Sequence, residues 1–206
     1  MPYTAEHKAE TRKRIVQSAR RLFNRHGFCE VSIDDIMAGA GLTRGGFYNH
    51  FKTKDELYAE AVTLVMDCNP SEAWDDVEID VNAQGAELAR QIVDGYLSRR
   101  HYEDIDVQCP MIALPSDVAR GGAAVKTAFR KVFESMVTVF AAGLEGGEAA
   151  ARKRAMGIAT LCVGGMVLAR AVDDDGLADE IRESARAMAL EASGWERPAH
   201  APGANA

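Results

Sequence analysis

Side chains suited to binding nucleic acid are concentrated in the segment 43–54, TRGGFYNHFKTK. Arg44 can bind a phosphate or a guanine, and Asn49 can read a base edge. Donors suited to phosphate oxygens are also present, on Thr43, Tyr48, His50, Lys52 and Lys54. The spacing places Phe47 and Phe51 on a shared buried face, which leaves the polar side chains outside. The pattern predicts a surface that binds double-stranded DNA.

Two adjacent glycines, Gly45 and Gly46, fall inside the helix expected over residues 43–51. Each glycine costs about 1 kcal/mol relative to alanine in a helix, so the pair is a poor scaffold. It suits a helix whose backbone approaches a DNA groove closely. A plain solvated helix with incidental polar residues is the alternative, and the glycines and the clustering disfavour it.

The segment before residue 43 is expected to form a short helix, which a glycine turn joins to the helix over residues 43–51. Ser32 is a good N-cap, and Asp35 stands three residues later, close to the capping-box pattern. The turn is expected at Gly39-Ala40-Gly41, because glycine adopts positive φ without steric cost. The apolar residues of this helix are expected to be buried: Ile33, Ile36 and Met37. A helix, a tight turn and a helix form a helix-turn-helix.

The charge is divided unevenly along the 206 residues. Residues 1–54 carry ten basic and five acidic side chains, a net +5, whereas residues 55–206 carry 14 basic and 26 acidic side chains. The total of −7 therefore hides a basic head on an acidic body, which is the electrostatic pattern of a DNA-binding domain attached to another unit.

Several classes of protein are disfavoured. No apolar run reaches the roughly 18 residues that a membrane span needs, and the N-terminus is too polar for a secretory signal, so a cytoplasmic protein without a membrane partner is expected. The four cysteines lie far apart, without a CxxC pair. Enzyme motifs such as the P-loop, GxSxG and HExxH are missing, so we expect no catalytic residues, no cofactor and no metal.

An all-α fold of about nine helices is expected from the apolar periodicity. The helix-turn-helix domain is assigned to residues 1–54, with three helices, and a larger helical domain to residues 55–194. Within it, helices are expected over residues 83–100, 123–144, 148–172 and 177–192, with a less regular stretch at 101–122 and a loop at 70–82. Residues 195–206 are expected to be a disordered tail.

Residues 8–65 resemble the DNA-binding domain of TetR-family (tetracycline-repressor-like) transcriptional regulators. The shared anchors are Leu22-Phe23, Gly27-Phe28, Ser32-Ile33, Tyr48-Asn49-His50-Phe51 and the Lys-x-Lys-x-x-Leu pattern at 52–57. The resemblance implies a homodimer that reads a pseudo-palindromic operator and carries a small-molecule pocket in its C-terminal domain.

The resemblance also implies individual contacts to DNA. Phosphate contacts are expected from Thr43, Tyr48, His50 and Lys54, and base contacts from Arg44, Gly45 and Asn49; Ser32 is placed on the same surface.

The dimer is expected to form through the eighth and ninth helices, residues 148–172 and 177–192. Small residues such as Gly157, Gly164 and Gly165 allow close helix packing there. An intramolecular core helix is the alternative interpretation.

An effector pocket with apolar walls is expected, bounded by the fourth to eighth helices. Its candidate lining residues are Met66, Tyr96, Tyr102, Met111, Phe129, Phe133 and Met136, although residues of each kind are more often plain core. Cys109 is a candidate electrophile or oxidant sensor, with nearby acidic residues expected to raise its pKa.

The sequence therefore predicts a repressor that an unidentified small-molecule effector releases from its operator. Three alternatives stay open: a thiol-based regulator of the same fold that uses Cys109, a helical sensor whose head no longer binds DNA, and an architectural DNA-binding protein without an effector.

Overall fold

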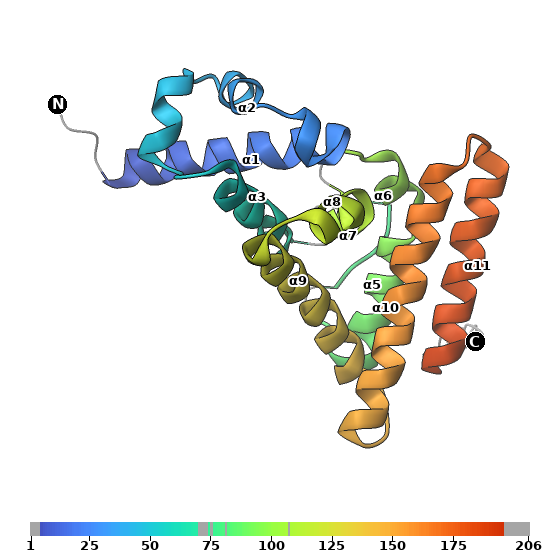
Figure 1. Ribbon diagram of the computed structural model, residues 1–206. Helices are drawn as coiled ribbons and strands as arrows, with labels where there is room; N and C mark the ends of the chain where they lie inside the picture. Colours follow the sequence, from blue (N-terminus) through green and yellow to red (C-terminus); the bar gives the residue numbers. More distant parts are fainter. Residues whose placement is uncertain (1–4, 70–73, 75, 81, 107, 196–206) are drawn as a thin grey trace, which may run out of the picture.

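The computed structural model describes residues 5–69, 74, 76–80, 82–106 and 108–195. All regular elements in this part of the chain are helices, which confirms the expected all-α class. The head contains α1 (Ala5–Glu30), α2 (Ile33–Gly39) and the 3-10 helix η1 (Arg44–Asn49). Figure 1 shows α1 lying across one end of the body, with α2 on the outer side of α1.

The long helix α1 forms because apolar residues recur on one face, and the buried members of that face include Ile15, Val16, Ala19 and Phe23. Gly27 interrupts the helix with φ of 76°, a conformation that favours glycine. The amide of Phe28 then donates to the Asp117 carboxylate at 2.8 Å. The end of α1 is therefore fixed to the body.

The capping box at the start of α2 is confirmed. The Asp35 amide donates to Ser32 Oγ at 3.1 Å, and the Ser32 amide donates to the Asp35 carboxylate at 2.9 Å. These bonds lower the pKa of Asp35, because they favour its charged form. At the end of the turn, Gly41 has φ of 68°, a positive value that glycine adopts without steric cost.

The second helix of the helix-turn-helix differs from the expected α-helix over residues 43–51. It is a 3-10 helix, held by the Gly46 amide on the Thr43 carbonyl at 3.0 Å and the His50 amide on the Phe47 carbonyl at 2.9 Å. The two glycines weaken the α-helical alternative. Thr43 stands at the N-cap, but its side chain makes no capping bond.

The head and the body share α3 (Lys54–Thr63), which packs against both α1 and α9 and is followed by η2 (Leu64–Asp67). The body continues with α5 (Gly85–Tyr96), α6 (Arg99–Glu103), α7 (Pro110–Ala113), α8 (Pro115–Arg120), α9 (Ala123–Ala142), α10 (Glu148–Ala171) and α11 (Asp175–Ser193). In Figure 1, α9 and α10 converge away from the head, and α7 and α8 fill the space near α1.

The helix expected over residues 83–100 is divided in two. The chain leaves α5 after Tyr96, and Ser98 then caps α6, its hydroxyl accepting from the His101 amide at 3.2 Å. The stretch 101–122 holds two further short helices, each with a proline in its first turn, where a missing amide costs nothing.

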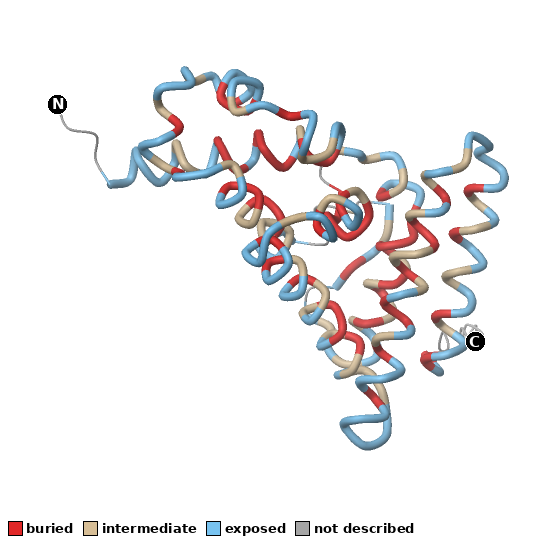
Figure 2. The backbone as a smooth tube through the Cα atoms, in the orientation of Figure 1, coloured by how far each residue is buried: buried red, intermediate tan, exposed pale blue. Residues whose placement is uncertain are grey.

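Figure 2 shows that the helices bury their facing sides and expose their outer sides. The expected tail was placed one residue too early, since Trp195 is only 6% exposed. Its indole donates to the Gly143 carbonyl at 2.7 Å, and its ring packs on Phe140 with centroids 5.9 Å apart. The rest of that tail, 196–206, lies outside the described residues.

Candidate DNA-binding surface and internal cavities

The residues predicted to contact DNA lie at the N-terminus of α2 and along η1. Six of them are exposed: Ser32, Thr43, Arg44, Gly45, Tyr48 and Asn49. Tyr48 is 62% exposed, and its ring stands edge-on to the buried Phe47 with centroids 5.2 Å apart. The core therefore fixes the base of the Tyr48 side chain, while its hydroxyl end is open to a partner.

The space around the paired glycines differs between the two. A Cβ atom at Gly45 would meet nothing within 4 Å, and one at Gly46 would lie 3.5 Å from Met37 Cε, an ordinary contact. Packing inside the chain therefore does not require glycine at either position. An external partner that approaches Gly45 closely remains the prediction for this position.

Arg44 forms an exposed ion pair with Asp34. Exposed pairs contribute only about 0–1 kcal/mol, so the guanidinium can exchange Asp34 for a phosphate or a base at little cost. Asn49 is exposed in the last turn of η1. Both side chains are therefore available for the roles predicted from their chemistry.

His50 is half-buried at the C-cap of η1, and its carbonyl accepts a hydrogen bond from Arg12. Burial lowers the pKa of His50, and the nearby Lys8 and Arg12 add to this effect. A neutral ring is therefore expected at pH 7, and it would contact DNA as a hydrogen-bonding group without charge.

The Lys54 side chain is held by contacts within the chain and is not free to bind a phosphate in this conformation. Its ammonium donates to the Phe28 carbonyl and lies 4.2 Å from the centroid of the Phe28 ring. Burial lowers its pKa. In this conformation Lys54 joins α3 to the end of α1, which the sequence pattern did not reveal, and its contact with DNA remains a prediction.

Other basic residues of the head are also held by the fold. Arg12 binds Glu60 at 2.6 Å and lies 3.9 Å over the Phe51 ring, Arg25 pairs with Asp106, and Arg20 is buried. The count of +5 thus overstates the charge offered to DNA. Exposed basic side chains of the head include Lys8, Lys13, Arg21 and Lys52, besides Arg14, Arg25 and Arg44.

The predicted effector residues are mostly core. Tyr96, Met111 and Met136 are buried, Phe129 and Phe133 are half-buried, and Met66 is exposed on η2. None of these six lines any of the three cavities described below, whereas Tyr102 lines one of them. Apolar side chains at helical spacing here reflect packing of the body.

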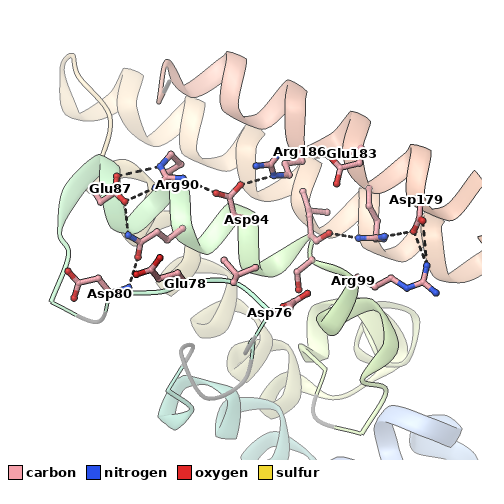
Figure 3. Close-up of a pocket in the computed structure, with 15 residues that line it drawn as sticks. Asp76, Glu78, Asp80, Glu87, Arg90, Asp94, Arg99, Asp179, Glu183 and Arg186 are labelled. Carbon is pink, nitrogen blue, oxygen red and sulfur yellow. Dashed lines mark hydrogen bonds and ion pairs between the residues drawn. The ribbon is translucent and has the colours of Figure 1, made fainter. Parts of the chain in front are cut away.

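The largest of the three cavities, about 1200 Å³, lies between α5 and α11 and is charged (Figure 3). Arg90 binds Glu87 at 2.6 Å and Asp94 at 2.9 Å, and Arg186 binds Asp94 at 2.7 Å. None of the described residues that line it is aromatic. Apolar periodicity in the sequence does not predict a cavity of this kind. The charged residues that line the cavity have the sequence pattern of a solvent-exposed helix face.

The second cavity, about 420 Å³, lies where α1, α6, α7 and α10 meet and includes Tyr102. The third, about 470 Å³, is an open groove along α10 and α11. The groove exposes Leu168 by 59% and Leu177 by 46%. Among the described helices, α10 is long and apolar enough to cross a membrane by length and composition, a test that core helices of soluble proteins also pass.

The position of Gly165 differs from the expectation that the small residues of α10 lie at a dimer interface. A Cβ atom there would lie 2.5 Å from Ala185 Cβ of α11 in the same chain, so Gly165 serves intramolecular packing. Gly157 and Gly164 meet nothing within 4 Å. Gly164 lines the open groove, and the small-residue argument for an interface therefore moves from Gly165 to Gly164.

Cys109 is buried, and burial raises the pKa of its thiol. The acidic neighbours proposed from the sequence are not the cause; Arg20 and Arg170 lie close enough to oppose the effect. The Cys109 amide donates to Nε2 of the buried His101 at 3.3 Å. In the described parts of the chain, no group of three or more His, Cys, Asp or Glu side chains is placed to hold a metal ion.

The fold and the exposed surface define a helical protein with a helix-turn-helix head on a larger helical body. Residues 15–61 match the family described as bacterial regulatory proteins, tetR family. The chain is therefore similar to this family over its helix-turn-helix head.

Curated relatives match about a quarter of the chain. The regulator AcrR of Shigella flexneri is 42% identical over 57 residues, which cover 28% of this chain and 26% of AcrR. TtgR of Pseudomonas putida is 43% identical over 54 residues, 26% of each chain. The match thus spans about a quarter of the length of these relatives.

Solved structures match most of the chain. The reduced form of NemR from E. coli has a TM-score of 0.68 at 14% identity, over 88% of this chain and 96% of NemR. A TetR-family transcriptional regulator from Agrobacterium tumefaciens has a TM-score of 0.67 at 21% identity, over 88% of this chain and 98% of that one. At these identities the likeness establishes the fold.

Proposed function

We propose that this protein is a homodimeric, sequence-specific transcriptional regulator that binds a pseudo-palindromic operator and is released from it by a small-molecule effector. The observation that carries the proposal is the exposed set on η1 and α2. Arg44 and Asn49 face outward beside Tyr48, on a helix-turn-helix held by buried Phe47 and Phe51. Such a surface reads base edges in a major groove.

The proposed dimer interface is the groove along α10 and α11. Leu177, Ile181 and Met188 recur at helical spacing on α11, and Leu161, Gly164 and Leu168 lie on α10. An exposed apolar face of this extent favours an interface with a second copy. A two-fold dimer would present two heads to half-sites about one helical turn apart.

The experiment that tests DNA reading is selection of bound fragments from a random duplex pool, followed by fluorescence anisotropy on the recovered site. Asn49→Ala is expected to weaken operator binding by roughly 1–3 kcal/mol and to leave random DNA unaffected. Asn82→Ala, exposed in the body, is the control. Equal loss on operator and random DNA would remove Asn49 from base reading, and a pool without an enriched site would contradict the proposal.

The way in which the head is attached to the body supports repression with release by an effector. The head is attached through α3 and the contacts of α1 to a body with sizeable cavities. An effector that binds the DNA-incompetent arrangement better would weaken operator binding by about 5- to 150-fold for a coupling of 1–3 kcal/mol.

A further inference from the structure

Three residues that line the cavity of about 420 Å³ at the junction of head and body carry buried hydrogen-bonding atoms that no described residue satisfies. Figure 1 shows α6 between the end of α1 and the near end of α10, which is where this cavity lies. Its lining residues come from α1 (Asn24), from the segments 102–105 and 108–113, and from α10 (Val167, Arg170, Ala171). We name it the junction cavity.

Arg170 supplies the positive charge of the junction cavity. Its Nη2 donates to the carbonyls of His101 and Asp104, while its Nε and Nη1 are buried without a partner. Burial lowers the pKa of Arg170, and the nearby Asp104 opposes this. Glu103, the carboxylate in the lining, is already paired with Arg99 at 2.6 Å. Two free donors on a guanidinium suit the oxygens of an anion.

Two amide side chains supply the acceptors. Asn24 Nδ2 donates to the carbonyls of Asp106 at 3.0 Å and Gln108 at 3.2 Å, and Gln108 Nε2 donates to the Asn24 carbonyl at 3.2 Å. Because a carbonyl only accepts, these bonds fix which end of each amide is nitrogen. Asn24 Oδ1 and Gln108 Oε1 are left as acceptors without a donor, on residues that are 7% and 3% exposed.

We propose that the junction cavity binds a small organic acid that also carries a hydroxyl group. The carboxylate would pair with Arg170, and the hydroxyl would donate to the amide oxygen of Asn24 or Gln108. The apolar part of the ligand would lie against Ile112 and Val167, with the Tyr102 ring at the edge. Water can satisfy the amides, but it carries no negative charge to pair with Nε and Nη1 of Arg170. The volume is within the range of small-molecule sites.

That such a ligand acts as the effector rests on the proposed function. The residues of the cavity also hold the head to the body, since Asn24 binds the Asp106 carbonyl and its neighbour Arg25 pairs with the Asp106 carboxylate. A ligand that binds Asn24 and Gln108 therefore contacts the residues that connect the head to the body. Its occupancy is therefore expected to change the position of the head relative to the body and to weaken operator binding.

The test is calorimetric titration of the full chain with the three hydroxybenzoate isomers and with the corresponding neutral hydroxybenzamides. At least one hydroxybenzoate is expected to bind saturably, and its amide at least about tenfold more weakly, because a charge-assisted bond is lost. Arg170→Gln is expected to cause a similar loss. The matched control is Arg152→Gln, an exposed arginine on the same helix, which should bind like the parent.

A second variant keeps the test decisive if Arg170→Gln fails to fold. Val167→Phe keeps the arginine and fills the cavity from α10, so it should abolish binding while preserving the helical circular dichroism. Failure of all three isomers to bind the parent, or binding that survives both variants, would overturn the site. Binding that is intact but leaves operator affinity unchanged would confirm the ligand site and contradict effector release, so the two proposals fail separately.

Discussion

The ammonium of Lys54 lies 4.2 Å from the centroid of the Phe28 ring and donates to the Phe28 carbonyl, closing the end of α1 against the start of α3. Lys52, two residues earlier, is exposed. Two lysines of one motif thus have different surroundings. A cation over an aromatic ring with a hydrogen-bonded carbonyl contributes to stability, whereas an exposed lysine is available to phosphate.

The first prediction separates these roles. Lys52→Ala is expected to flatten the slope of log K against log salt for DNA binding by about 0.9, because one phosphate contact is lost. Lys54→Ala is expected to lower the free energy of unfolding by roughly 1–2 kcal/mol and to leave the slope unchanged. Salt titrations by anisotropy and urea unfolding measure the two effects. A flattened slope for Lys54→Ala at unchanged stability would restore its phosphate role.

A second prediction concerns the two adjacent glycines of α10. Gly165→Leu is expected to destabilise the fold by about 1–3 kcal/mol or more, because a Cβ atom at 165 would lie 2.5 Å from Ala185 Cβ. Gly164→Leu has open space in its own chain, so it should fold and instead disturb the dimer. Thermal unfolding and light scattering after size exclusion distinguish the two outcomes.

Leu168→Asp provides the direct test of the same interface, with Met66→Asp as its control, because both side chains are about half exposed and apolar. Only Leu168→Asp is expected to yield a monomer. A dimer that survives both Leu168→Asp and Gly164→Leu would place the interface on another surface.

The head was the most predictable part of the chain from sequence. Its caps, its turn glycine and the four-residue spacing of Phe47 and Phe51 are local signals that act within a few residues, and the structure contains each of them. The 3-10 form of η1 is less predictable, because the glycine pair indicates close approach to DNA and does not by itself specify the helix geometry.

The helices of the body could be predicted from the sequence, but the positions of its cavities could not. A buried Tyr96 and a cavity-lining Tyr102 have the same residue type, and only the packing of distant segments distinguishes them. The junction cavity depends on Asn24, Gln108 and Arg170, which lie far apart in sequence and carry no shared spacing signal. A charge count likewise cannot show that Arg12 is held by Glu60.

The third prediction is a loss of stability in mild acid caused by His101. Its Nδ1 donates to the Tyr96 carbonyl at 2.7 Å and its Nε2 accepts from the Cys109 amide, so the buried ring is neutral. Burial lowers the pKa of His101 to about 4. The unfolded chain therefore binds the proton first, and stability present above pH ~6.5 falls as the pH decreases towards ~4, by at most roughly 3 kcal/mol.

Urea unfolding at a series of pH values measures this effect. His101→Gln is expected to be less stable at neutral pH and to show a flatter dependence between pH ~6.5 and ~4. His26→Gln, at an exposed position, should retain the parent's dependence. An unchanged slope in His101→Gln would show that another group titrates in this window.

The last prediction decides between a pocket and a thiol sensor. Cys29 and Cys68 are exposed and Cys109 is buried, and burial raises the pKa of Cys109, so its reactive thiolate is suppressed. N-ethylmaleimide is therefore expected to label Cys29 and Cys68 quickly, and Cys109 at least about a thousandfold more slowly, at the rate at which the fold opens. Mass spectrometry of peptides after timed labelling measures each site.

Peroxide should then leave operator binding unchanged in the parent, and Cys109→Ser should respond to a junction-cavity ligand as the parent does. The Cys29→Ser, Cys68→Ser double variant removes the exposed thiols and isolates Cys109. Rapid labelling of Cys109 in this variant, together with peroxide release of DNA that Cys109→Ser abolishes, would favour the thiol-based regulator over the pocket.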